Sequence, residues 1–438
     1  MSLSTSTLRI QNRLVHQSQS GRKHWDLYRW LLDPILLCDA THLVLKNDGS
    51  AGIDQVACAS IKGKEWDFAV SLSRKLREKS YKPTAVRRVY IPKKDGRKRP
   101  LGIPNLEDRV VQRALVILME PIYEQVFLPC SFGFRPGKRA QDCVAQTAKA
   151  VYKHRYVLEA DIESFFDRVN HKKLVKMLGD QIVDPRVVRL IKSILKTGFQ
   201  EVGKPWQPTP QGTPQGGPLS PLLANIYLHY VLDQKFAKLN SSNSKLFRYA
   251  DDFVIVCRTQ TEVRAMKQLV KEWLKEADLN LKKEKTKVID MRNKSRSHDS
   301  KFDFLGFKVH LRAFRDNPER FWIARQPSEE ARASLRQTLK EKLTANLSRE
   351  EASKLAKSIW KGWAEYFRYG NANRIFYRQV KTVKRVLIGY LRRKYRRQRR
   401  PVPWRKLLKW WKYMTKRLRP TRVIPDSVTQ KSNQQAWF

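Results

Sequence analysis

Two adjacent aspartates, Asp251 and Asp252, have the type and spacing that most clearly suggest chemistry. They lie between two short runs of aromatic and β-branched residues, 247–249 and 253–257, which is the pattern of two strands joined by a tight turn. Neighbouring carboxylates can converge only where a turn breaks the alternation of side chains along a strand. Two carboxylates about 4 Å apart repel by roughly 4 kcal/mol at an effective dielectric near 20, and a cation such as Mg²⁺ removes that repulsion. A polar Asp-Asp turn without a metal is the competing interpretation.

A third acid, Asp161, strengthens the case for a metal site. Residues 156–162 read as a strand that ends at Asp161, and residues 163–167 bend away from it toward a helix whose cap is Asn170. An acid at the end of a strand beside a turn suits a metal ligand, although it also suits a simple helix cap. The three aspartates together therefore make a divalent-cation site the stronger prediction.

The elements around these acids alternate between helices and strands. Apolar residues at helical spacing predict helices over 23–45, 64–79 and 107–125. Past residue 325 the composition changes, and a charged amphipathic helix is predicted over 328–350, followed by a second helix over 373–395.

Three loops carry residue types suited to binding. A strand is predicted over 86–91, and residues 101–103 could return as a second strand after the basic turn 92–100. In that turn, either the cations form a solvated hairpin or Lys93 and Arg99 hold a triphosphate. The loop 131–137 carries aromatics and a cation that could stack on bases, or could fill a local core. The glycines and prolines of 211–222 allow close backbone approach before an apolar helix, whose N-terminus favours anions.

The formal net charge of +48 predicts a polyanionic partner, with nucleic acid favoured over a membrane surface. A chain of 438 residues suggests about two to four domains. No run of eighteen apolar residues is present, so we expect no transmembrane helix and no membrane partner. The five scattered cysteines favour a reducing compartment. We expect the bacterial cytoplasm, with an organelle as the alternative because residues 1–25 lack acids and weakly resemble a transit peptide.

In their order along the chain these segments resemble reverse transcriptases, specifically the bacterial group II intron-encoded proteins. The resemblance rests on Asp161 in its strand-to-helix turn, on Pro214-Gln215-Gly216-Gly217 before a helix, and on Tyr249-Ala250-Asp251-Asp252 in a hairpin. It runs from about residue 45 to about residue 395. The flanking segments that resemble the bacterial branch are 91–96, 99–104, 132–137 and 302–307.

The resemblance implies an α+β fold of the right-hand polymerase type, with fingers, a palm built on an antiparallel sheet, and a helical thumb that is also the maturase domain X. A basic C-terminal region similar to a DNA-binding segment would follow. The implied division is an N-terminal extension 1–45, fingers 46–155, a palm 156–310 that includes helices 170–200, a linker 311–325, the thumb 326–395 and the C-terminal region 396–438.

The resemblance also implies roles for individual residues. Asp161, Asp251 and Asp252 would be the catalytic carboxylates that hold two Mg²⁺ ions, with Mn²⁺ as a substitute. The nucleotide-binding residues would be Lys93 and Arg99 on the triphosphate, Gln215 at the start of a helix, Phe166 as a gate against a ribose 2′-hydroxyl, and Lys285 as a general acid toward pyrophosphate. Four lysines compete for this last role, and a solvated turn explains them equally well. Segment 302–307 would place the primer terminus, or simply pack on the palm.

The stretch from Tyr366 through Pro425 contains 21 lysines and arginines and no acid, which indicates a polyanion nearby. Trp404 and the aromatics that follow it could stack on bases or could form the core of a small helical domain. The predicted nucleic-acid-binding residues are Arg135, Arg392, Arg393, Lys394, Arg396, Arg397, Arg399, Arg400 and Trp404.

The function implied is an RNA-directed DNA polymerase and intron maturase. Its partners would be its own intron RNA, an RNA template with a DNA primer, target DNA and dNTPs. No histidine follows His310 and no cysteine follows Cys257, so we expect no HNH endonuclease. The alternatives are an RNA-binding splicing factor with a vestigial polymerase, and a reverse transcriptase recruited to phage defence or diversification without an intron.

Overall fold

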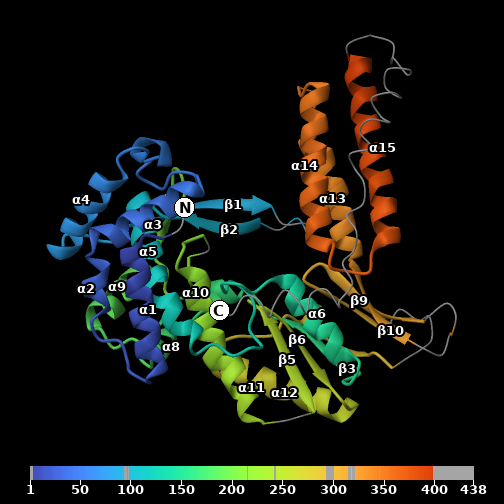
Figure 1. The fold of residues 1–438 in the computed structure, drawn as a ribbon, viewed down its shortest axis with the longest axis horizontal. Helices are drawn as coiled ribbons and strands as arrows, with labels where there is room; N and C mark the ends of the chain where they lie inside the picture. Colours follow the sequence, from blue (N-terminus) through green and yellow to red (C-terminus); the bar gives the residue numbers. More distant parts are fainter. Residues whose placement is uncertain are drawn as a thin grey trace.

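The computed structural model describes residues 3–92, 96, 98–214, 216–240, 243–292, 300–313, 317, 321–344 and 346–397. Figure 1 shows a helical N-terminal region on one side, a sheet at the centre and a group of long helices standing on the other side. The described helices include none long and apolar enough to cross a membrane. Five residues with predicted roles lie outside the described residues: Lys93, Gln215, Arg399, Arg400 and Trp404.

The N-terminal region packs around α5, which is buried along most of its length. The helices are α1 (Thr5–Gln19), α2 (Leu27–Leu31), α3 (Pro34–Lys46), η1 (Cys58–Ile61), α4 (Glu65–Arg77) and α5 (Leu106–Glu124). The single helix expected over 23–45 was wrong. Pro34 disfavours helical geometry at the residue before it, so the chain breaks at Asp33, whose carboxylate caps α3. Trp25, an apolar residue within that range, is 72% exposed.

A small sheet projects from this region as the β1–β2 hairpin (Figure 1). Its strands are β1 (Val86–Pro92), β2 (Lys98–Ile103) and β4 (Phe199–Gln200), in the order β2-β1-β4. The prediction of two strands around a basic turn is confirmed.

The central sheet has the order β5-β6-β3-β7, with all neighbours antiparallel. Its strands are β3 (Tyr156–Asp161), β5 (Ser244–Tyr249), β6 (Asp252–Cys257) and β7 (Lys287–Asp290). Apolar residues alternate in β6: Phe253 and Ile255 join the core that contains α5 and α12, while Val254 and Val256 join the core that contains α6. The sheet is therefore covered on both faces, and its end carries the acids.

The helices of this part of the chain lie around the two cores that cover the faces of the sheet. They are α6 (Ala140–Val151), α7 (Phe165–Arg168), α8 (His171–Leu178), α9 (Pro185–Leu195), α10 (Ser220–Leu228), η2 (His229–Asp233), α11 (Gln234–Lys238), α12 (Gln260–Glu276) and η3 (Lys283–Lys285). Asn170 caps α8 as predicted, because its side-chain oxygen accepts a hydrogen bond from the backbone N–H of Lys173.

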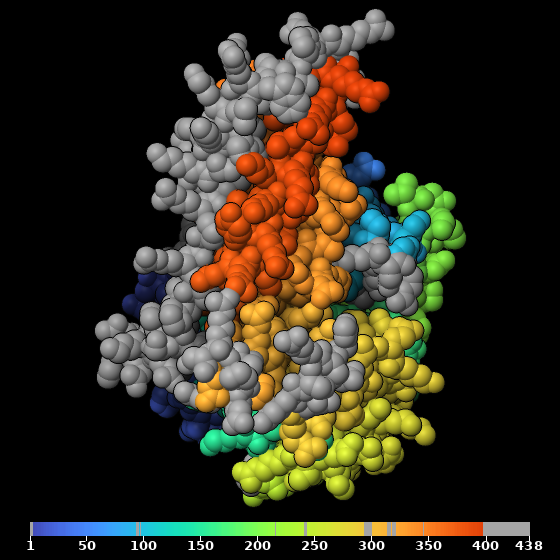
Figure 2. Space-filling model, turned by 90° about the vertical axis from the view of Figure 1, so that its right-hand side faces the viewer, coloured from blue at the N-terminus to red at the C-terminus, as the bar shows by residue number. Residues whose placement is uncertain are grey.

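The C-terminal helices stand on a third sheet of order β10-β9-β8, and Figure 2 shows α14 and α15 rising side by side from it. The elements are β8 (Lys301–Phe304), β9 (Phe307–Ala313), β10 (Phe321–Pro327), α13 (Glu329–Lys342), α14 (Arg349–Phe367) and α15 (Asn373–Arg397). Of the expected linker 311–325, residues 311–313 and 321–325 belong to the β9–β10 pair. The helix expected over 328–350 ends at Lys342 instead, because Ser348 and Glu351 form a capping box that starts α14.

A fully buried ion pair joins the central sheet to the helices behind it. The Arg248 guanidinium donates to both carboxylate oxygens of Asp233, at 2.7 and 2.5 Å, and both side chains are 0% exposed. It also donates to Ser131 Oγ (2.7 Å), Asn225 Oδ1 (3.1 Å) and the carbonyl oxygen of Ala250 (3.1 Å). One side chain thus ties together β5, α10, η2 and the loop before α6.

We predict that Arg248→Met lowers the free energy of unfolding by about 3–5 kcal/mol, because Asp233 is left as an uncompensated buried charge. Denaturant unfolding measures the loss. The matched control is Lys361→Gln, which breaks an exposed pair with Glu365 at 3.8 Å and should cost less than about 1 kcal/mol. Equal losses in the two variants would contradict the structural role of the buried pair.

Candidate active site

Asp161 and Asp252 lie directly opposite each other at one end of the central sheet. Asp161 is the last residue of β3 and pairs with Asp252, the first residue of β6. By alternation, Asp161 shares a face with Val157 and Asp252 shares a face with Val254, and both valines pack in the core that contains α6. The two carboxylates therefore emerge on the same face of neighbouring strands.

Asp251 reaches this face from the hairpin turn. Tyr249 and Asp252 are the last paired residues, so Ala250 and Asp251 form a two-residue connection. Ala250 has φ = +57°, the left-handed conformation that tight hairpin turns require. Gly133 packs against this turn: a Cβ on Gly133 would lie 2.4 Å from the Ala250 nitrogen. The turn is thus held in a strained conformation by the loop before α6.

Asp251 and Asp252 are both perturbed by their surroundings. Burial, together with the charges of Asp161 and Asp251, raises the pKa of Asp252 to about 7. Burial also raises the pKa of Asp251, again with the charge of Asp161 acting in the same direction. Carboxylates whose pKa values rise in this way are buried close to one another, and the positive charge nearby does not offset their burial and repulsion.

One ammonium group partly supplies that charge. Lys285 Nζ lies 2.6 Å from Asp161 Oδ2. Its partial burial opposes the charged form, but the hydrogen bond and charge of Asp161 outweigh burial, so the pKa of Lys285 lies above its ordinary value. Two backbone bonds fix this loop to the end of β3: the Lys282 N–H donates to the Asp161 carbonyl (2.8 Å), and the Glu163 N–H donates to the Asn280 carbonyl (2.9 Å). Among the competing lysines, the structure places Lys285 on an aspartate.

The donor set fits divalent cations. The described residues contain no ready-made cluster of three or more His, Cys, Asp or Glu at metal-binding spacing. Asp161, Asp251 and Asp252 nevertheless offer only oxygen donors, which Mg²⁺ and Mn²⁺ prefer. Burial and the charge of Asp161 raise the pKa values of Asp251 and Asp252, and a bound cation would offset both effects. These three residues would hold the metal.

A corner next to the acids is built from β2, α7 and the part of segment 211–222 that precedes α10, which we call the glycine-rich loop. Gly216 (φ = +118°) packs on β2 so closely that a Cβ would lie 2.5 Å from the Gly102 carbonyl oxygen. The Thr213 N–H donates to the carbonyl oxygen of Phe166 (2.7 Å). Arg99 is exposed on β2, and its charge lowers the pKa of Asp251. The burial of Asp251 and the charge of Asp161 raise that pKa by more. Phe166 is half-buried, edge-on to Phe165 at 5.5 Å.

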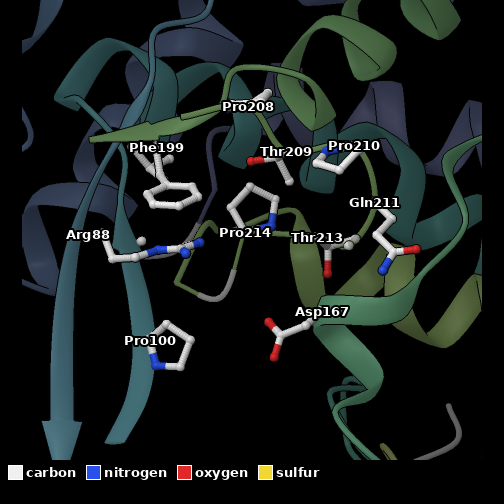
Figure 3. A pocket seen from close by; sticks show the side chains of 13 residues that line it. Arg88, Pro100, Asp167, Phe199, Pro208, Thr209, Pro210, Gln211, Thr213 and Pro214 are labelled. Atoms are coloured by element: carbon white, nitrogen blue, oxygen red, sulfur yellow. The ribbon is translucent and has the colours of Figure 1, made fainter. Parts of the chain in front are cut away.

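Behind this corner is a cavity of about 410 Å³. Residues 208–214 form one wall, and Figure 3 shows Arg88 and Phe199 on another with Asp167 facing them. The Arg88 guanidinium lies over the Phe199 ring, 3.3 Å from its centre. The segment that leads into the glycine-rich loop therefore borders a cavity instead of packing against neighbouring residues along its whole length.

The comparisons with known proteins agree with this geometry. Residues 91–309 match the family model described as reverse transcriptase (RNA-dependent DNA polymerase), and residues 331–419 match the group II intron, maturase-specific domain. Protein YkfC of Escherichia coli is 31% identical over 345 residues, covering 70% of this chain and 88% of YkfC.

The chain belongs to the reverse transcriptase family.

Group II intron-encoded protein LtrA of Lactococcus lactis is 37% identical over 228 residues, which cover 51% of this chain and 37% of LtrA. The "Uncharacterized 91 kDa protein in cob intron" of Schizosaccharomyces pombe is 35% identical over 182 residues, or 42% of this chain and 22% of that protein. This reverse transcriptase chain thus spans well under half the length of those two intron proteins, and it joins the polymerase family to a maturase-specific domain.

The cations predicted to bind nucleic acid differ in their surroundings. Arg135 faces inward: its side chain is 5% exposed and donates to Glu124 (2.8 Å) and to the Leu128 and Ser131 carbonyl oxygens. The structure gives Arg135 a role in holding the loop, because its donors are used inside the protein. Arg392, Arg393 and Arg396 are exposed near the end of α15, and the Lys394 ammonium donates to the Leu347 carbonyl oxygen. Arg397 is the last residue of α15.

Sequence reasoning missed the residues that support the catalytic turn. Arg248, Asp233 and Asn225 form the buried network under Ala250, and Gly133 provides the close approach. The available signal was an aspartate directly after the apolar run 223–232 and an arginine directly before Tyr249. A charge in each of two otherwise apolar stretches indicates a buried pair.

We predict that Mg²⁺ raises the melting temperature by about 2 °C or more at pH 8 and by less at pH 5.5. The folded pKa of Asp252, about 7, lies above the value of 3.8 for a free side chain. The metal-free folded state therefore binds the proton more tightly than the unfolded chain does, and this group's contribution to stability falls as pH rises through that interval. Above it Asp252 is charged and free to bind the cation.

Differential scanning fluorimetry at both pH values, with and without Mg²⁺, measures this dependence. Asp252→Asn should reduce both the Mg²⁺ shift and its pH dependence, whereas the exposed control Asp67→Asn on α4 should reduce neither. If Mg²⁺ shifts the melting temperature equally in wild type and in Asp252→Asn, Asp252 is not a metal ligand.

Proposed function

We propose that this chain copies RNA into DNA from a DNA primer, and that it binds its own group II intron RNA and assists its splicing. The observation that carries the polymerase part is the convergence of Asp161, Asp251 and Asp252 at the end of one sheet, beside a corner with a cation and a glycine-rich loop. The N-terminal region with β1 and β2 would be the fingers, the central sheet the palm, and α13–α15 the thumb and maturase domain. The proposed boundaries are those given above.

In the proposed reaction the primer 3′-hydroxyl attacks the α-phosphate of a dNTP and pyrophosphate leaves. Divalent ions held by the three aspartates would activate the hydroxyl and neutralise charge on the phosphates. Arg99 and Lys93 would bind the triphosphate from the fingers, and Gln215 would contact the nucleotide. Lys285 would donate a proton to the leaving group; its support is an ammonium already inside the site, 2.6 Å from Asp161.

The maturase part rests on a different surface. The C-terminal helices carry exposed Arg392, Arg393 and Arg396 near the end of α15, in a chain whose net charge is +48. The splicing chemistry would belong to the RNA, and the protein would neutralise phosphate charge and hold the fold. The basic region 396–438 would bind nucleic acid, either target DNA or RNA. Relatives from two bacteria support the cytoplasm as the location.

We predict that Asp251→Asn abolishes DNA synthesis and leaves the affinity for intron RNA within about twofold of wild type. The substitution removes a metal ligand and leaves the basic surfaces of α15 unchanged. Primer extension on an RNA template with dNTPs and Mg²⁺ measures synthesis, and filter binding measures affinity. Asp67→Asn is the matched control and should extend normally. Extension by neither wild type nor variant, with tight RNA binding in both, would favour the splicing factor with a vestigial polymerase.

We predict that Phe166→Ala increases the ratio of ribonucleotide to deoxyribonucleotide incorporation by about tenfold or more, because the ring no longer excludes a 2′-hydroxyl. Single-nucleotide extension with dNTP or rNTP gives kcat/KM for each. Phe68→Ala on α4 also removes a half-buried phenyl ring and should leave the ratio unchanged. An unchanged ratio in Phe166→Ala would mean that a different residue excludes the 2′-hydroxyl.

A further inference from the structure

Phe134 has an unusual backbone for a bulky residue. Its φ is +55°, in the left-handed region, and its side chain is 50% exposed. Aromatic residues occupy that region rarely, and such strain persists only where the surrounding structure determines it. A ring that is both strained and half in solvent is not explained by core packing.

Both neighbours of Phe134 are fixed. On one side, the Phe132 N–H donates to the Arg248 carbonyl oxygen (2.8 Å), and the Gly133 carbonyl oxygen accepts from Asn225 Nδ2 (2.6 Å). On the other side, the guanidinium of Arg135 is anchored on Glu124. The backbone at 134 therefore has no freedom to turn the ring inward.

The ring stands beside the catalytic turn. Its centroid lies 6.5 Å from that of Tyr249, with the planes tilted by 42°. Tyr249 is half-buried and pairs with Asp252 in the hairpin. The two rings form a partly exposed aromatic surface on edge strand β5, next to a carboxylate of the site.

This surface lies toward the C-terminal helices rather than toward β2. Directly after the loop, Arg139 lies over the Tyr369 ring at 5.1 Å, and Gln141 Nε2 donates to the Tyr366 carbonyl oxygen at 3.2 Å. Arg99, by contrast, acts on Asp251 from β2. An incoming triphosphate would occupy the side of the acids with the β2 cation, so the growing duplex must leave on the other side.

We propose that Phe134, with Tyr249, contacts the primer strand next to its 3′ terminus, and that the Phe134 ring packs against the sugar and base edge of the penultimate nucleotide. This inference rests on the proposed polymerase function. An aromatic contact of this kind is indifferent to the base, as a polymerase that copies any sequence requires. Phe134 is a duplex-binding residue that positions the primer end.

The test compares Phe134→Asn with Phe134→Tyr. Asparagine removes the ring and is among the side chains that tolerate φ > 0 best, so folding should be preserved. We expect the melting temperature and the affinity for intron RNA to remain at wild-type values. The KM for primer–template and its Kd, measured by fluorescence anisotropy without dNTPs, should each rise about tenfold. Phe134→Tyr should behave as wild type, and Trp66→Ala, which removes a 52% exposed ring on α4, should leave the KM unchanged.

The strand is identified with abasic substrates. An abasic site at the penultimate primer nucleotide should weaken binding to wild type and add little to the effect of Phe134→Asn, whereas an abasic site in the template opposite it should be additive. Any of three results would overturn the inference. The first is a wild-type Kd for Phe134→Asn, and the second is a lower melting temperature with an unchanged Kd. The third is that Phe134→Asn is coupled to the abasic site in the template instead of the one in the primer. Because binding is measured without synthesis, a chain that binds primer–template but never extends it would defeat the polymerase proposal alone.

Discussion

The buried Arg248–Asp233 ion pair is the interaction on which the arrangement of the acidic site depends. Two charges removed from water are stable only when every donor finds a partner, and Arg248 achieves this by bonding to four separate parts of the chain. Its bond to the Ala250 carbonyl reaches the hairpin turn itself. The requirement that this guanidinium be fully satisfied therefore fixes β5, the loop before α6 and the helix behind the sheet relative to one another.

Because these segments are fixed, two unfavourable features can exist side by side: backbone strain and repulsion between carboxylates. Ala250 and Phe134 both occupy the left-handed region, and they lie on the two segments that Gly133 brings into contact. Beside them, burial and the repulsion from Asp161 and Asp251 together raise the pKa of Asp252 to about 7. Strain and charge repulsion would each relax if the turn could move. The buried pair and the anchored loop prevent that movement, so the site remains ready for cations.

The parts of this structure that the sequence predicted are those decided by local patterns. The hairpin, the strand that ends at Asp161 and the cap at Asn170 follow from alternation, turn length and a single hydrogen bond. Local patterns were not sufficient where distant residues decide the surroundings of a side chain. Arg135 looks like a binding cation until Glu124 is brought beside it, and Lys285 stands out from its neighbouring lysines only once backbone bonds place its loop at β3.

The pairing of Asp161 with Asp252 also determines how this chain can tolerate insertions and deletions. Side chains alternate with a period of two, so deleting one residue between Val157 and Asp161 would put these two side chains on opposite faces. Either Asp161 would then turn toward the core that contains α12, or Val157 would leave its packing face. A substitution in β3 changes one side chain, whereas a single-residue gap inverts every side chain on one side of the gap. Length changes should therefore be confined to connections away from the sheet, such as the exposed turn at Gly203, where a Cβ would meet nothing within 4 Å.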